Sequence, residues 1–180
     1  LVVDITNQGI APPKLRSRPA EASIRIESGG RCGGSMVNHG VRWYFALLCP
    51  AAAETVLWRG TAAGAASGGH LLQPVRPREA AELTLGEAEC GSARAGVVFR
   101  NTPGAEVPLF VGLSLSCERE AAVAAEAAAA RGFDALRAEA ADGWEDHLAR
   151  IRIDGAEERD RRIFYTALYH SLIKPVQTEP

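Results

Sequence analysis

The stretch Val111-Gly112-Leu113-Ser114-Leu115-Ser116-Cys117 runs directly into Glu118–Arg131, and the sequence changes character between them. The first stretch alternates between apolar and small or polar residues, as a half-buried β-strand does. The second consists almost entirely of Ala, Glu and Arg, which are among the strongest helix formers. The sequence therefore predicts a β region up to residue 117 and a helical region after it.

Upstream of this boundary, short stretches with a period of two recur between turn residues. Residues 23–27 alternate cleanly, whereas residues 42–48 are apolar on both faces and should lie centrally in a sheet. The predicted strands are Leu1–Thr6, Ala22–Glu27, Val41–Leu48, Glu54–Arg59, Ala80–Leu85, Ala95–Arg100 and Val107–Ser116. We predict an antiparallel β-sandwich over residues 1–117, incomplete at its N-terminus.

Downstream, three helices are predicted. The first covers Glu118–Arg131, with Ser116 as its N-cap and Gly132 at its end. The second begins near Asp134 and carries Leu136, Ala140, Trp144 and Leu148 on one face. Residues 150–154 alternate like a short strand, and a third helix begins near Ala156. We assign residues 118–155 to a helical linker and residues 156–180 to the start of a further domain.

The third helix is apolar and aromatic around most of its surface and ends near Pro175. Its predicted buried stripe is Ile163, Phe164, Ala167, Leu168, Ser171 and Leu172. Three helices do not offer this stripe a partner, so we expect an exposed apolar patch or pairing with another copy. The chain also opens inside an apolar stretch at Leu1, and we expect both ends to be cuts through a longer protein.

Composition excludes several classes of protein. The chain has 180 residues, of which 47% are hydrophobic and 23% charged, with a formal net charge of −2. This balance excludes a disordered chain and argues against nucleic acid or an anionic membrane as the main partner. No apolar run approaches the roughly 20 residues that cross a bilayer.

The four cysteines, Cys32, Cys49, Cys90 and Cys117, form no C-x-x-C pair, which makes a structural zinc site improbable. They allow three disulfide connectivities, and free buried thiols are equally compatible with the sequence. No histidine pair has metal-ligand spacing, and no G-x-S-x-G motif is present. The glycine-rich residues 29–34 lie between strands, so we interpret them as a turn and not as a phosphate loop.

Carboxylates are frequent in the helices, but their positions fit solvated charges better than a catalytic pair. Glu139, Asp142, Glu145 and Asp146 lie opposite or beside the apolar face of the second helix. The residues alone therefore indicate a β-sandwich followed by three helices, without a visible active site.

A resemblance adds to this interpretation. Phe164-Tyr165-Thr166-Ala167-Leu168-Tyr169-His170-Ser171-Leu172, followed by Pro175, resembles the opening helix of the catalytic domain of glycoside hydrolase family 92. The preceding order is similar too: a strand at 111–116, an Ala/Glu helix, residues 132–134, then Trp144 and Leu148, and the segment 150–155. The resemblance is good over residues 107–175 and loose over residues 1–106.

Family 92 contains bacterial exo-acting α-mannosidases, many of them α-1,2-specific. The resemblance implies an N-terminal β-sandwich, a helical linker and an (α/α)6 barrel, and a calcium-dependent inverting enzyme that acts on mannose-containing glycans. It implies a secreted, cell-surface or periplasmic protein. In the family, both catalytic carboxylates and the calcium ligands follow this helix in the barrel, so we assign no catalytic or metal residue here and expect this chain alone to be inactive.

Three residues are carried forward as candidates for substrate binding. His170 and Lys174, near the end of the last helix, are placed to approach the rim of the barrel's cleft, together with residues 177–179. Trp58 is a candidate sugar platform, as is Trp43. Each candidate has a competing interpretation that we favour. For His170 it is a hydrogen-bonded position in the interior of the barrel, and for Trp43 and Trp58 it is a position in the sandwich core.

Two alternatives stay open. One is a non-catalytic carbohydrate-binding or scaffolding β-sandwich, which exposed aromatic residues along one sheet face would favour. Sugar binding that is lost when Trp58 is replaced by Ala would favour it too. The other is a different hydrolase or phosphorylase that combines a β-sandwich with an (α/α)6 barrel.

Overall fold

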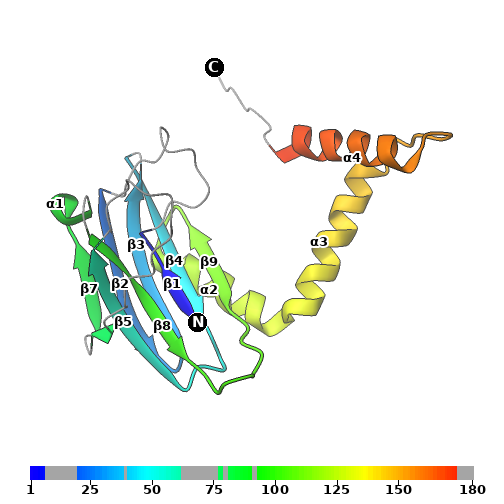
Figure 1. Cartoon of the computed structure of the whole chain (residues 1–180). Coiled ribbons are helices and arrows are strands. Elements are labelled where there is room, and N and C mark those ends of the chain that lie inside the picture. The colour runs from blue at the N-terminus through cyan, green and yellow to red at the C-terminus, as the bar shows by residue number, and fades with distance from the viewer. Residues whose placement is uncertain (7–19, 39, 62–76, 79–80, 91–92, 174–180) are drawn as a thin grey trace. The chain divides into compact units, whose positions relative to one another are not determined.

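The computed structural model describes residues 1–6, 20–38, 40–61, 77–78, 81–90 and 93–173, shown as coloured ribbon in Figure 1. The chain forms two compact units, Leu1–Arg131 and Gly132–Pro180. Each unit is described by itself below. None of the described helices combines the length and the hydropathy that crossing a lipid bilayer requires.

The first unit contains two antiparallel sheets. The four-stranded sheet has the order β1 (Val2–Asp4), β8 (Ala93–Arg100), β5 (Glu54–Thr61), β6 (Pro77–Arg78). The five-stranded sheet has the order β7 (Glu82–Leu85), β2 (Glu21–Ser28), β3 (Arg31–Asn38), β4 (Val41–Leu48), β9 (Phe110–Ser114). A short helix, α1 (Glu87–Cys90), follows β7. Antiparallel sheets followed by helices are the predicted combination, which the structure confirms.

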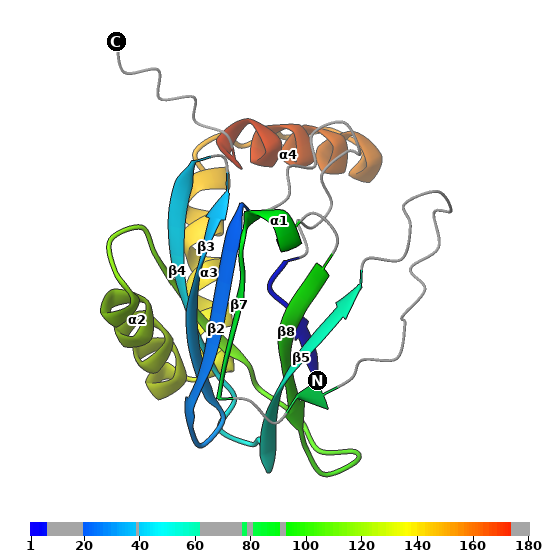
Figure 2. The ribbon, with the colours of Figure 1, turned by 90° about the vertical axis from the view of Figure 1, so that its left-hand side faces the viewer.

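The two sheets share one hydrophobic core. Ile24 and Leu85 of the five-stranded sheet are fully buried, as are Leu57, Val97 and Phe99 of the four-stranded sheet. Figure 2 shows the sheets as two facing layers. Inward-pointing residues alternate with outward-pointing ones along each strand, so each sheet contributes every second side chain to this core.

Two described strands, β3 and the two-residue β6, were not predicted. Arg31–Asn38 forms β3, which pairs with β2 on one side and β4 on the other, although its glycines indicated a turn. The turn is confined to Gly29 and Gly30, which have positive φ angles of 51° and 78°. A Cβ at Gly34 would collide with the backbone oxygen of Ser23 and with the ring of Phe45, so glycine here allows close packing.

Helix α2 (Glu118–Arg131) has the predicted bounds and packs on the outer face of the five-stranded sheet. Ala121 and Ala125 are buried there against Ala46 of β4. A Cβ at Gly112 of β9 would collide with the backbone oxygen of Ala121, so the strand and the helix lie in direct backbone contact. The first compact unit therefore includes α2; the predicted domain boundaries remain a prediction.

The start of α2 is organised by Ser114 and not by the predicted cap, Ser116. The Oγ of Ser114 accepts hydrogen bonds from the backbone amides of Ser116 and Cys117, at 3.0 Å and 3.3 Å. It donates to Oε2 of Glu120 at 2.7 Å. The hydroxyl that serves the helix thus comes from the last residue of β9, which ties the strand to the first turn of α2.

The second unit contains α3 (Phe133–Leu148) and α4 (Glu158–Ile173). The rings of Trp144 and Tyr169 meet edge to face, with centroids 4.6 Å apart. The strand predicted over residues 150–154 is wrong, because this segment has no strand beside it with which to pair. No described residue of α4 is buried, and Ile163 and Leu172 of its apolar stripe are exposed, which is the exposed patch predicted for a stripe without a partner.

Candidate functional site

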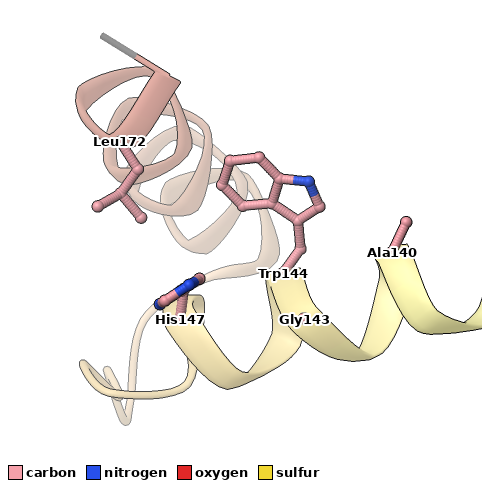
Figure 3. A pocket seen from close by; sticks show the side chains of 5 residues that line it. All are labelled: Ala140, Gly143, Trp144, His147 and Leu172. Atoms are coloured by element: carbon pink, nitrogen blue, oxygen red, sulfur yellow. The ribbon is translucent and has the colours of Figure 1, made fainter. Parts of the chain in front are cut away.

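A shallow groove lies between α3 and α4 in the second unit. Its volume is about 380 Å³, and Ala140, Gly143, Trp144, His147 and Leu172 line it. Figure 3 shows the indole and the imidazole rising from α3 toward Leu172 of α4. An aromatic face beside an imidazole can bind an amphipathic ligand. None of the lining residues carries a carboxylate, so the groove has no acid–base pair.

Sequence analysis did not single out His147 as a site residue. It lies three positions after Trp144, and residues so spaced share one face of a helix. The prediction that Trp144 belongs to the apolar face of the second helix was therefore the signal that could have found the groove. What the sequence could not show is which residue of the third helix would stand opposite.

The candidates on α4 are only partly described. His170 is exposed, and its ring centroid lies 5.8 Å from that of Tyr169. Lys174 and residues 177–179 lie outside the described residues. Of the predicted cleft-rim residues the structure describes only His170, so the role of this group remains a prediction.

The two tryptophan candidates lie in opposite environments. Trp58 is only 6% exposed, and its Nε1 donates a hydrogen bond to the backbone oxygen of Val3 at 3.2 Å. A Cβ at Gly96 would come within 2.7 Å of that Nε1, so the indole lies flat against the next strand. Trp58 is thus buried, as we favoured, but on the outer face of the four-stranded sheet, because its neighbour Leu57 points into the shared core. Trp43, for which we also favoured the core, is instead 39% exposed at the end of β4.

Carboxylates in the described residues do not gather into a metal centre. Glu139, Asp142, Glu145 and Asp146 are all exposed, as predicted for solvated charges. No group of three or more His, Cys, Asp or Glu side chains in the described part of the chain could hold a metal ion. The residues that the structure describes therefore do not fit a calcium site.

The pKa of the Glu89 carboxyl is lowered from its usual value. A hydrogen bond from Arg59 lowers its pKa, helped by a second hydrogen bond from the backbone amide of Gly86 at 3.2 Å. A general acid must instead carry its proton near neutral pH. This carboxylate therefore serves to fix α1 beside β5 and is unsuited to proton donation.

All four cysteines are free thiols in the structure. Cys32, Cys49 and Cys90 are buried, and Cys117 is half-buried. Burial raises the pKa of Cys32 to about 12, and burial also raises the pKa of Cys49 and Cys90. Because the thiolate is the reactive form, these three thiols should be inert in the folded chain.

We expect a thiol-specific disulfide reagent at pH 8 to modify Cys117 readily and the three buried thiols only after unfolding. The reason is that burial both excludes the reagent and disfavours the thiolate. Spectrophotometric titration before and after adding guanidinium chloride measures this. Rapid modification of Cys32 in the folded state, identified by peptide mass, would contradict the placement of β3 in the core. A Cys117→Ser variant serves as the control for the fast phase.

Comparisons with known proteins address the resemblance directly. Residues 119–179 match the model of the glycosyl hydrolase family 92 catalytic domain. No curated protein matches the chain significantly. Among solved structures, the chain is similar to the family GH92 inverting mannosidase from Bacteroides thetaiotaomicron VPI-5482, with a TM-score of 0.62 and 20% sequence identity.

That similarity covers 86% of this chain but only 20% of the solved chain, so this chain spans about a fifth of the relative's length. At this level of identity the similarity concerns the fold. The family model concerns the sequence of α2, α3 and α4. Together, the two comparisons confirm the predicted resemblance to glycoside hydrolase family 92, with partial coverage of the chain.

Proposed function

We propose that this chain is part of a family 92 glycoside hydrolase that removes terminal α-linked mannose from glycans with inversion at the anomeric carbon. The match of residues 119–179 to the family's catalytic domain is the observation that carries the proposal. The fold similarity to an inverting mannosidase supports it. An α-1,2 preference and export from the cytoplasm are part of the proposal, as the family resemblance implies.

Inverting hydrolysis requires two carboxyl groups on opposite faces of the sugar. One protonates the leaving oxygen and the other activates water, and they stand roughly 6.5–9.5 Å apart so that the water fits between them. The groove beside α4 has no carboxylate among its lining residues. We therefore assign both carboxylates, and the calcium ligands, to parts of the enzyme other than the described residues.

In this proposal α4 is the first helix of an (α/α)6 barrel. Its exposed apolar side chains, among them Ile163, Leu172 and Ile173, support this assignment, because soluble proteins seldom leave such side chains together in water. Further barrel helices would bury them. When the 180-residue chain is made alone, the same surface is expected to promote self-association.

We expect the full-length polypeptide to hydrolyse an aryl α-mannoside in the presence of calcium, and the 180-residue chain to show no turnover. Release of the aryl group, followed by absorbance, measures both. Chelation should abolish turnover by the full-length polypeptide, and added calcium should restore it. Turnover by the 180-residue chain, or a full-length polypeptide inactive on α-mannosides but active on another glycoside, would contradict the proposal.

A carbohydrate-binding module is the second candidate function. The observation in its favour is Trp43, an exposed aromatic residue on a sheet. If this function is correct, titration calorimetry should detect binding of manno-oligosaccharides to the isolated chain. The Trp43→Ala variant should then show no heat of binding. Trp58→Ala does not test this candidate cleanly, because it removes a buried side chain and destabilises the fold.

A further inference from the structure

A row of apolar side chains along β9 and the segment before it is only half covered. Val107 and Leu109 pack against the hydrophobic core between the two sheets. The next two members of the same alternating row, Val111 and Leu113, are 50% and 59% exposed. The core therefore covers only the first part of this row of apolar side chains and leaves the second part in solvent.

The strand register confirms that the exposed residues belong to the inner face. Leu113 stands opposite Phe45, and Val111 opposite Leu47, in the pairing of β9 with β4. Residues directly opposite each other share one face of a sheet. Phe45 and Leu47 are buried in the core, so Val111 and Leu113 also point to the inner side. Val41 and Trp43 continue the row of Phe45 along β4 and are likewise exposed.

Together, these four exposed side chains form the inner-face patch: Val41, Trp43, Val111 and Leu113. The order of strands explains why this part of the face is open. Strand β5 contacts β2 across the core, and β8 and β1 follow β5 in the four-stranded sheet, toward β4 in the view of Figure 1. No described strand of the four-stranded sheet is left to stand opposite β9. Figure 1 shows β1 in front of β4, at this side of the domain.

The edge of β1 offers a place for another strand. Leu1 exchanges backbone hydrogen bonds with Phe99 of β8, and the amide of Ile5 donates to Ala95 at 3.0 Å. In an antiparallel ladder, alternate residues point their backbone groups to opposite sides. The backbone groups of Val2 and Asp4 therefore point to the other side of β1, where no described strand pairs with them.

We propose that a further extended strand of the same polypeptide adds to this free edge of β1 and places alternate apolar side chains on the inner-face patch. A strand fits because it would satisfy the open backbone groups and the apolar row at once. The source rests on the proposed function: the solved relative is about four times as long as this chain, so an enzyme of that kind has ample polypeptide to supply the strand.

Maleimide labelling of an introduced cysteine tests this, in a Cys117→Ser background that removes the half-buried native thiol. The test variant is Leu113→Cys, and the matched control is Val123→Cys, which lies on α2 and is 58% exposed. In the 180-residue chain both sites should be labelled rapidly. In the full-length polypeptide, the labelling rate at position 113 should be at least tenfold lower than in the 180-residue chain. Position 123 serves as the reference for an uncovered site.

Hydrogen exchange identifies what covers the patch. The amides of Val2 and Asp4 should exchange quickly in the 180-residue chain and slowly in the full-length polypeptide, if a strand pairs with β1. Equal labelling of position 113 in both proteins would overturn the proposal. Protection of position 113 without protection of these amides would also overturn it, because a surface other than a strand would then cover the patch.

Protection that appears in the 180-residue chain and rises with protein concentration would assign the patch to a second copy and would also overturn the proposal. None of these readouts depends on hydrolysis. An inactive full-length polypeptide with a protected position 113 would contradict the proposed function alone, and an active one with an unprotected position would contradict the added strand alone.

Discussion

Replacing Phe99 by alanine is expected to lower the free energy of unfolding of the two-sheet unit by about 3–5 kcal/mol. Phe99 is fully buried in β8, in the core that both sheets share. Alanine would remove most of the ring's buried area and leave a cavity that the rigid strands around it fill only partly. Urea unfolding of the 180-residue chain, followed by circular dichroism, measures the change.

The matched control is Val2→Ala in the neighbouring strand β1, where the side chain is exposed. This substitution should change the free energy of unfolding by less than about 0.5 kcal/mol. Similar losses for the two variants would mean that the sheets do not share the core described here. A loss confined to Phe99→Ala places the centre of the domain between β8 and the five-stranded sheet.

The second large effect is expected from Gly112→Ala. Its Cβ would collide with the backbone oxygen of Ala121 and come within 2.6 Å of the backbone nitrogen of Ala125. Backbone atoms of a helix cannot turn aside as a side chain can, so α2 must shift away from β9. We expect a loss of about 1–3 kcal/mol and faster proteolysis of α2.

Gly143→Ala is the control, because nothing lies within 4 Å of the Cβ that it would add to α3. Alanine is better than glycine in a helix by roughly 1 kcal/mol, so this variant should be slightly more stable or unchanged. The same chemical change is thus expected to act in opposite directions at the two sites. A neutral Gly112→Ala would show that α2 does not rest on β9 at this position.

Much of the fold could be predicted from local pattern. The bounds of β4 and α2 followed from a run that is apolar on both faces and from an uninterrupted series of helix formers. Strand β3 was missed because Gly33 and Gly34 are poor strand formers. At Gly34, glycine is required by the close approach of the two neighbouring strands. The ring of Phe45 and the backbone of β2 occupy the space that a Cβ would need, and no single-sequence pattern reveals such a contact.

The candidate site was less predictable. The exposure of Trp43 depends on where the four-stranded sheet ends, and the burial of Trp58 depends on Gly96 in the next strand; neither is a property of local sequence. The groove at Trp144 and His147 depends on how α3 meets α4. The periodicity of the sequence predicted which face of α3 is apolar, but not that α4 packs beside it. The family resemblance was recognisable because the aromatic run of α4 is unusual as a sequence, whatever surrounds it.

The stereochemistry of the released sugar tests the central claim most directly. The full-length polypeptide, given an aryl α-mannoside in the presence of calcium, would be followed by proton NMR from the first minutes of reaction. The account predicts that β-mannose forms first and then equilibrates slowly to the mixture of anomers, because a single displacement by water inverts the anomeric carbon. α-Mannose as the first product, or no hydrolysis of α-mannosides at all, would contradict it.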